Sequence, residues 1–98
     1  MRIIATTISA TGMTMMELPP GTQMLSVELD IHDIEQLTVY MLADTTSSER
    51  IQYVFSPFHL GAEVEEPWGF LGLVRLPESL VHVFYAEADD TFDFMDLL

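Results

Sequence analysis

The sequence predicts a mostly β fold, an antiparallel sheet or sandwich of six to seven short strands with room for one short helix at the C-terminus. Residues 80–85, Leu-Val-His-Val-Phe-Tyr, form the densest β-forming apolar run and are bounded by polar segments on both sides. Residues 24–31 alternate between apolar and polar side chains with period two. Turn-forming residues separate such runs, and only residues 90–98 show a helical period. This pattern is typical of packed antiparallel strands.

The composition indicates one folded and strongly acidic domain. The 98 residues carry a net charge of −13, yet 49% of them are hydrophobic, so the low hydrophobicity typical of disorder is absent. We assign residues 1–86 to a single β-rich domain and residues 87–98 to an acidic-hydrophobic tail. Cysteine is absent from the sequence, which excludes disulfides, thiolate zinc sites and cysteine nucleophiles.

The N-terminal half predicts four strands. Residues 2–10 and 13–18 favour strands on either side of a turn, which together indicate an N-terminal hairpin. Residues 19–22, Pro-Pro-Gly-Thr, form a loop, because the prolines fix φ and the glycine can take a positive φ. Residues 24–31 then form a half-buried strand whose acids face water, and residues 37–43 form the next strand.

The C-terminal half predicts three more strands. The polar residues 44–49 indicate a hairpin loop before a strand at 50–56, which Pro57 should end or place at a sheet edge. Residues 58–69 form a long acidic loop of the kind that is often functional. Residues 70–76 resume as a strand.

Three details complete the predicted elements. Gly72 marks a bulge or a close backbone approach within its strand. Residues 80–85 should be an interior strand with both faces largely covered. In the tail, Asp90 is placed to cap a helix that carries Phe92, Met95 and Leu98 on one face.

The sequence offers no catalytic or metal-binding pattern. His32, His59 and His82 are spaced too widely for any local ligand motif. His82 lies in the most apolar strand, where a neutral, hydrogen-bonded core histidine is expected. No nucleophile elbow or phosphate-binding glycine loop is present. We therefore expect no enzyme activity, no catalytic residue, no metal and no cofactor.

The acidic surface is the feature that the fold itself does not need. Solubility of a small domain requires a net charge of only ~2–8. Same-face side chains on a strand, such as Glu28 and Asp30, recur every ~6.6 Å, close to two rises of one DNA strand at ~3.4 Å each. The candidate partner-binding residues are the acids of three clusters and an adjacent tryptophan that is either a loop anchor or an interface hot spot: Glu28, Asp30, Asp33, Glu35, Glu63, Glu65, Glu66, Trp68, Glu87, Asp89, Asp90, Asp93 and Asp96.

The charge also selects the kind of partner. A strongly negative protein repels nucleic acid and anionic membranes, so we expect neither to bind directly. The expected partner is a basic host protein with a nucleic-acid-binding channel. No span approaches the ~20 apolar residues of a membrane helix, and we expect a cytoplasmic protein. The apolar side chains of the tail leave a homodimer open.

Several short motifs succeed one another in a fixed order and spacing. They are Glu17-Leu18-Pro19-Pro20-Gly21, Leu25-Ser26-Val27, Ala43-Asp44, Glu49-Arg50, Phe70-Leu71-Gly72 and Val81-His82-Val83-Phe84. In this respect residues from about 17 to 85 resemble a family of small uncharacterised phage and prophage proteins, although Ser56-Pro57-Phe58-His59 departs from the glycine- and threonine-containing turn expected there. The resemblance implies a compact β-rich fold and a mobile-element origin, and it brings no catalytic residues.

The leading hypothesis is a phage-encoded inhibitor that binds a host nucleic-acid-binding defence protein, such as a CRISPR effector complex, through a DNA-mimicking acidic surface. In composition and size the chain is similar to anti-CRISPR and anti-restriction DNA mimics. One alternative is an adaptor that presents the motif at residues 90–98 to a partner groove. Another is an accessory virion protein whose charge is incidental.

Overall fold

The computed structural model describes residues 1–65 and 68–88, and within them seven strands form two antiparallel sheets without any helix. The predicted β-sandwich is thus confirmed, whereas the predicted C-terminal helix lies outside the described residues. The strands are β1 (Arg2–Ser9), β2 (Thr14–Leu18), β3 (Gln23–Leu29), β4 (Gln36–Ala43), β5 (Ile51–His59), β6 (Gly69–Arg75) and β7 (Leu80–Ala88).

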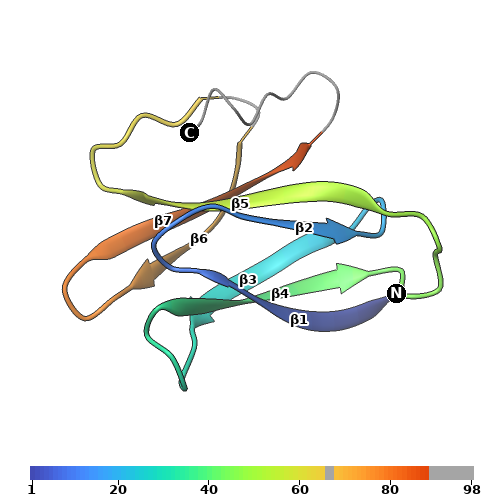
Figure 1. Cartoon of the computed structure of the whole chain (residues 1–98), viewed down its shortest axis with the longest axis horizontal. Helices are drawn as coiled ribbons and strands as arrows, with labels where there is room; N and C mark the ends of the chain where they lie inside the picture. Colours follow the sequence, from blue (N-terminus) through green and yellow to red (C-terminus); the bar gives the residue numbers. More distant parts are fainter. Residues whose placement is uncertain (66–67, 89–98) are drawn as a thin grey trace.

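The two sheets have the strand orders β1-β4-β3 and β2-β5-β7-β6 and face each other as two layers (Figure 1). Only β3–β4 and β6–β7 pair as sequential hairpins. The chain passes from one sheet to the other after β1, after β2 and after β4. The β5–β6 connection returns to the same sheet after crossing over β7.

Two predicted hairpins are therefore wrong, although their strands exist. β1 pairs with β4, and β2 pairs with β5 in the other sheet. The Ser9 hydroxyl accepts the backbone N–H groups of Thr11 and Gly12, each at 3.1 Å, and the Ser9 N–H donates to Thr14 Oγ1 at 2.9 Å. These local bonds turn the chain out of the first sheet. The polar segment 44–49 likewise joins β4 to β5 across the two sheets.

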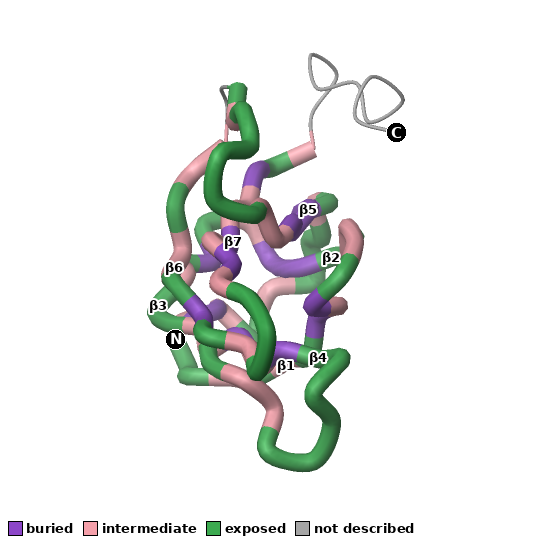
Figure 2. The backbone as a smooth tube through the Cα atoms, turned by 90° about the vertical axis from the view of Figure 1, so that its left-hand side faces the viewer, coloured by how far each residue is buried: buried purple, intermediate pink, exposed green. Residues whose placement is uncertain are grey.

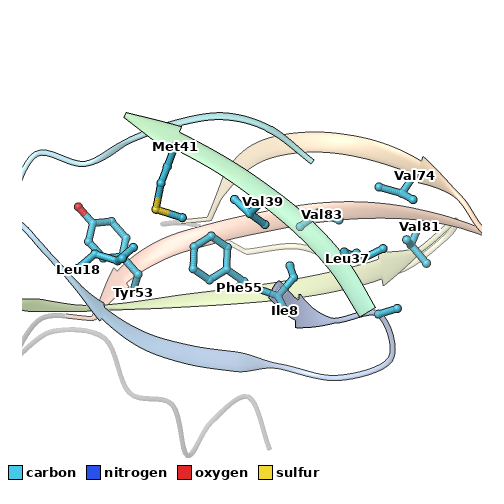
Figure 3. Close-up of a cluster of buried hydrophobic side chains, with 11 residues drawn as sticks. Ile8, Leu18, Leu37, Val39, Met41, Tyr53, Phe55, Val74, Val81 and Val83 are labelled. Atoms are coloured by element: carbon cyan, nitrogen blue, oxygen red, sulfur yellow. The ribbon is translucent and has the colours of Figure 1, made fainter. Parts of the chain in front are cut away.

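The core lies between the layers and is built from the inward side chains of the central strands (Figure 3). Strand β7 lies between β5 and β6, which confirms the predicted interior strand. Figure 2 shows the buried residues gathered between the sheets and the exposed ones in the loops at both ends. The fully buried large side chains come from three strands: Leu37, Val39, Met41, Tyr53, Val54, Phe55, Val81 and Val83.

Both predicted roles of Gly72, a bulge and a close approach of another strand, are confirmed. The register between β6 and β7 shifts between Phe70 and Gly72, which is a β-bulge. A Cβ atom added at Gly72 would lie 2.8 Å from Cγ1 of Val27 on β3. The missing side chain therefore lets β3 and β6 approach and close one side of the sandwich.

Three strand ends differ from the predicted ones by more than one residue. β3 ends at Leu29 rather than at residue 31. β5 continues through Pro57 to His59. Because β2 pairs with β5 only as far as Phe55, Pro57 lies on a locally free sheet edge, which is one of the two predicted alternatives. β7 extends to Ala88, two residues beyond the predicted end of the domain.

Candidate binding surfaces

The described carboxylates all reach solvent. None of them is buried, and the described arginines form no ion pair with them. Arg50, for example, donates to the backbone carbonyls of Ser47 at 2.7 Å and Glu49 at 2.8 Å instead. Since no described arginine is ion-paired with these carboxylates, a basic partner is attracted by nearly all of this negative charge.

The first acid cluster lies at the end of β3 and in the β3–β4 loop. Glu28 is on the outer face of the three-stranded sheet, where the Tyr40 hydroxyl donates to its Oε1 at 2.7 Å and where this bond raises the pKa of Tyr40. Asp30 Oδ1 accepts the N–H of His32 at 2.8 Å, and Asp33 Oδ1 accepts the N–H of Glu35 at 2.9 Å. We name Glu28, Asp30, Asp33 and Glu35 the acidic loop surface.

Within this surface, the expectation that Glu28 and Asp30 lie on one extended strand is wrong. The strand ends at Leu29, and the Asp30 carboxylate caps the next turn. Aspartate side chains compete with sheet pairing in this way by bonding to their own backbone. Asp30 and Asp33 are therefore held by turn geometry, and Glu28 is held by the Tyr40 hydroxyl, so three of the four carboxylates accept a hydrogen bond.

Two isoleucines that sequence reasoning missed lie among these acids. Ile31 is 88% exposed and Ile34 is 63% exposed. Period-two alternation places Ile31 on the buried face, but the turn at Asp30 ends that alternation. The signal that could have located them is the pair of aspartates at 30 and 33, which are typical turn formers. Together they add apolar contact area to the acidic loop surface.

The second acid cluster lies in the β5–β6 connection. Glu63 and Glu65 are exposed, whereas Glu66 lies outside the described residues. The Trp68 N–H donates to the Glu65 carbonyl at 3.3 Å, and the half-buried Trp68 ring packs edge-on against Phe58 with centroids 5.6 Å apart. This contact favours the loop-anchor role of Trp68 over the hot-spot role.

Beneath that connection lies an aromatic patch on the outer face of the four-stranded sheet. Phe58 and Phe70 each approach Phe84, with centroids 5.4 Å apart, and Phe70 lies 6.2 Å from the His82 ring. His82 is half-buried and lies outside the inter-sheet core, so its predicted core position is wrong. Residues 60–64 cover a hollow of about 200 Å³ lined by Phe58, His82 and Phe84. Among the described residues, no three His, Asp or Glu side chains gather to hold a metal ion.

Glu87 belongs to the folded domain. It lies on β7 opposite Tyr53, whose hydroxyl donates to Glu87 Oε1 at 3.2 Å. Burial, followed by the Glu87 charge, raises the pKa of Tyr53 to about 12. The other candidate acids of this cluster, Asp89, Asp90, Asp93 and Asp96, lie outside the described residues.

The structure does not bring the described acids of the first two clusters onto one face. The β3–β4 loop and the β5–β6 connection project from opposite sides of the sandwich (Figures 1 and 2). A partner with one flat contact surface can therefore touch only one of these two clusters at a time. The acidic loop surface is the one whose carboxylates are fixed by hydrogen bonds.

The fold and these surfaces define an acidic two-layer β-sandwich. No family model matches the sequence, and no curated protein or solved structure matches it either. No helix in the described part of the chain is long and apolar enough to cross a membrane.

Proposed function

We propose that the protein is a phage-encoded inhibitor that occupies the nucleic-acid-binding channel of a basic host defence protein, such as a CRISPR effector, in the host cytoplasm. One observation supports this most: every described carboxylate reaches solvent and none is ion-paired, in a chain of net charge −13. Such a field attracts lysine- and arginine-lined channels and accelerates association with them. The motif resemblance to phage and prophage proteins is consistent with this role.

We assign the main contact to the acidic loop surface. Hydrogen bonds fix Asp30, Asp33 and Glu28 before any partner arrives, so little side-chain entropy is lost on binding. Each of these carboxylates has a second oxygen left to accept from a cationic side chain. Ile31 and Ile34 supply apolar contact that a purely electrostatic surface lacks.

Neutralising variants test this assignment without disturbing the turn. The combination Glu28→Gln, Asp30→Asn, Asp33→Asn and Glu35→Gln removes four charges but keeps an acceptor oxygen at each position. A matched control, Glu17→Gln, Asp44→Asn, Glu49→Gln and Glu63→Gln, makes the same charge change elsewhere on the surface. Host proteins captured by the wild type are identified by mass spectrometry, purified and titrated against all three proteins.

We expect the first combination to weaken binding at least about tenfold, mainly by slowing association, and the control to weaken it by less than about threefold. Equal losses would contradict the acidic loop surface as the contact. Competition tests the mimicry itself: added KCl should weaken the complex steeply, and duplex DNA should displace the protein. A stable ternary complex of the protein, its partner and DNA would exclude nucleic-acid mimicry.

A further inference from the structure

The edge strands of the two sheets are unequally protected against pairing with another chain. Natural sheet edges carry short strands, bulges, charges or proline, which block such pairing. Edge strands β3 and β6 each contain a bulge, and β2 has only five residues, including Glu17. Edge strand β1 has no bulge and no proline, and its one charged residue, Arg2, stands at its first position.

Strand β1 is long, regular and free of acidic side chains. Its eight residues pair with β4 without interruption, from Arg2↔Ala43 to Ser9↔Gln36. Residues 3–8, Ile-Ile-Ala-Thr-Thr-Ile, are mostly strong β formers without charge. Among the described strands, none pairs with β1 on the side facing away from β4 (Figure 1). Its outward backbone groups are therefore open to a further strand.

The core is also incompletely covered at this edge. Ile4 faces inward opposite Met41, which is fully buried, but Ile4 itself is only half-buried. On the outer face of the same strand, Ile3 is 69% exposed. A strand added beside β1 would cover both isoleucines.

We propose that β1 pairs with β1 of a second copy of this chain, antiparallel about a two-fold axis, so that the two three-stranded sheets become one continuous sheet. A net charge of −13 opposes self-association, and β1 offers a contact that contains no carboxylate. Paired residues share a face of the sheet. The inward faces therefore remain aligned when Ala5 lies opposite Ala5 or Thr6 lies opposite Thr6.

Charge complementarity favours a second copy over an unrelated strand. Arg2 is the only charged residue on β1 and forms no ion pair in the described structure. Antiparallel pairing places each Arg2 near the C-terminal end of the other copy's β1. There Asp33 and Glu35 line a hollow of about 390 Å³ beside Ser9. The symmetric pair thus makes this contact twice.

The oligomeric state of the full chain tests the proposal. Light scattering after size exclusion should show a dimer for the wild type and a monomer for Ala5→Lys, with a dissociation constant at least about tenfold higher. Ser26→Lys, an exposed position on the opposite edge of the same sheet, makes the same charge change and should remain dimeric. Circular dichroism establishes that both variants are folded. A monomeric wild type at all concentrations, or equal effects of the two variants, would overturn the proposal.

Because the chain contains no cysteine, single-cysteine variants report the contact directly. Oxidation should cross-link Ala5→Cys into covalent dimers if Ala5 lies opposite Ala5, or Thr6→Cys if Thr6 lies opposite Thr6. On a non-reducing gel, Ser26→Cys should remain monomeric. Cross-linking of Ser26→Cys alone would contradict pairing through β1. Arg2→Glu should weaken the dimer and added Glu35→Arg should restore it; failure to restore would overturn the Arg2 contact.

Discussion

At the scale of single residues, Tyr53 couples folding to alkaline pH. Its side chain is 1% exposed, and burial together with Glu87 raises the pKa of the hydroxyl to about 12. A tyrosine in the unfolded chain titrates near ~10. The unfolded state therefore loses its proton first, so this contribution to stability is complete below about pH 10 and is lost as the pH rises towards about 12.

The substitution Tyr53→Phe tests that coupling. At about pH 7 we expect the free energy of unfolding to change by less than about 1 kcal/mol, because Glu87 stays exposed to water when it loses its donor. At about pH 11 the variant should be more stable than the wild type, because it no longer has a phenol that ionises on unfolding. Urea unfolding at the two pH values gives both free energies. Alkaline destabilisation as steep in the variant as in the wild type would contradict the assignment.

Single residues also show why part of the candidate site was predictable. Glu28 lies on the outer face of its strand, as its period-two position predicts. The same period predicts a buried Ile31, yet Ile31 is exposed, because the Asp30 carboxylate bonds to the His32 N–H and ends the strand early. The hydrophobic period predicts which face of the sheet a side chain occupies only as long as the strand continues. Here the Asp30 side chain ends the strand.

At the scale of elements, all seven strands were predictable but several of their partners were not. Alternation and turn residues located each strand to within three residues of its ends. The hairpin expected between β1 and β2 fails because Ser9 directs the chain to the opposite sheet. Whether β1 and β2 pair with each other depends on the Ser9 hydroxyl and on the distant strands β4 and β5. The local sequence carries no information about those strands. Fold class was accordingly predictable, and sheet topology was not.

The contact between β3 and β6 gives the element-scale prediction. Gly72→Ala places a Cβ atom 2.8 Å from Cγ1 of Val27, and a β-branched side chain has few rotamers with which to withdraw. We expect a loss of about 1–3 kcal/mol in the free energy of unfolding, measured with urea. Gly12→Ala is the matched control, since the nearest atom to its added Cβ would be Ser9 Oγ at 4.0 Å.

Relief by Val27→Ala identifies the cause of that loss. If the two side chains clash, the double variant should be more stable than the sum of the two single changes predicts. Strictly additive losses would mean that Gly72 is needed for the bulge geometry rather than for the approach of β3.

At the scale of the whole molecule, the apolar core and the surface charge act separately. The core is closed by uncharged side chains from both sheets, and the described carboxylates lie outside it. Charge can therefore be removed from a loop or from the tail without opening the core. This separation lets the two binding hypotheses, the acidic loop surface and the adaptor motif at residues 90–98, be tested on the same fold.

Truncation after Ala88 distinguishes the acidic loop surface from the adaptor motif as the binding site. It removes Asp89, Asp90, Asp93 and Asp96 but keeps β7 complete, with the Tyr53 hydroxyl bond to Glu87. If the acidic loop surface is the contact, the truncated protein should still bind the captured basic partner, with a loss below about tenfold from weaker long-range attraction. Neutralising the acidic loop surface in the truncated chain should then abolish most of the remaining binding.

The adaptor hypothesis requires the opposite result. Truncation alone would abolish binding, a synthetic peptide of residues 89–98 would bind the partner, and the four neutralising substitutions in the full chain would change little. Binding is measured by titration of the purified partner, after circular dichroism has shown that the truncated chain retains its β signal. Because the truncation leaves every described strand intact, a complete loss with an unchanged spectrum would place recognition in the tail and exclude the acidic loop surface as the principal contact.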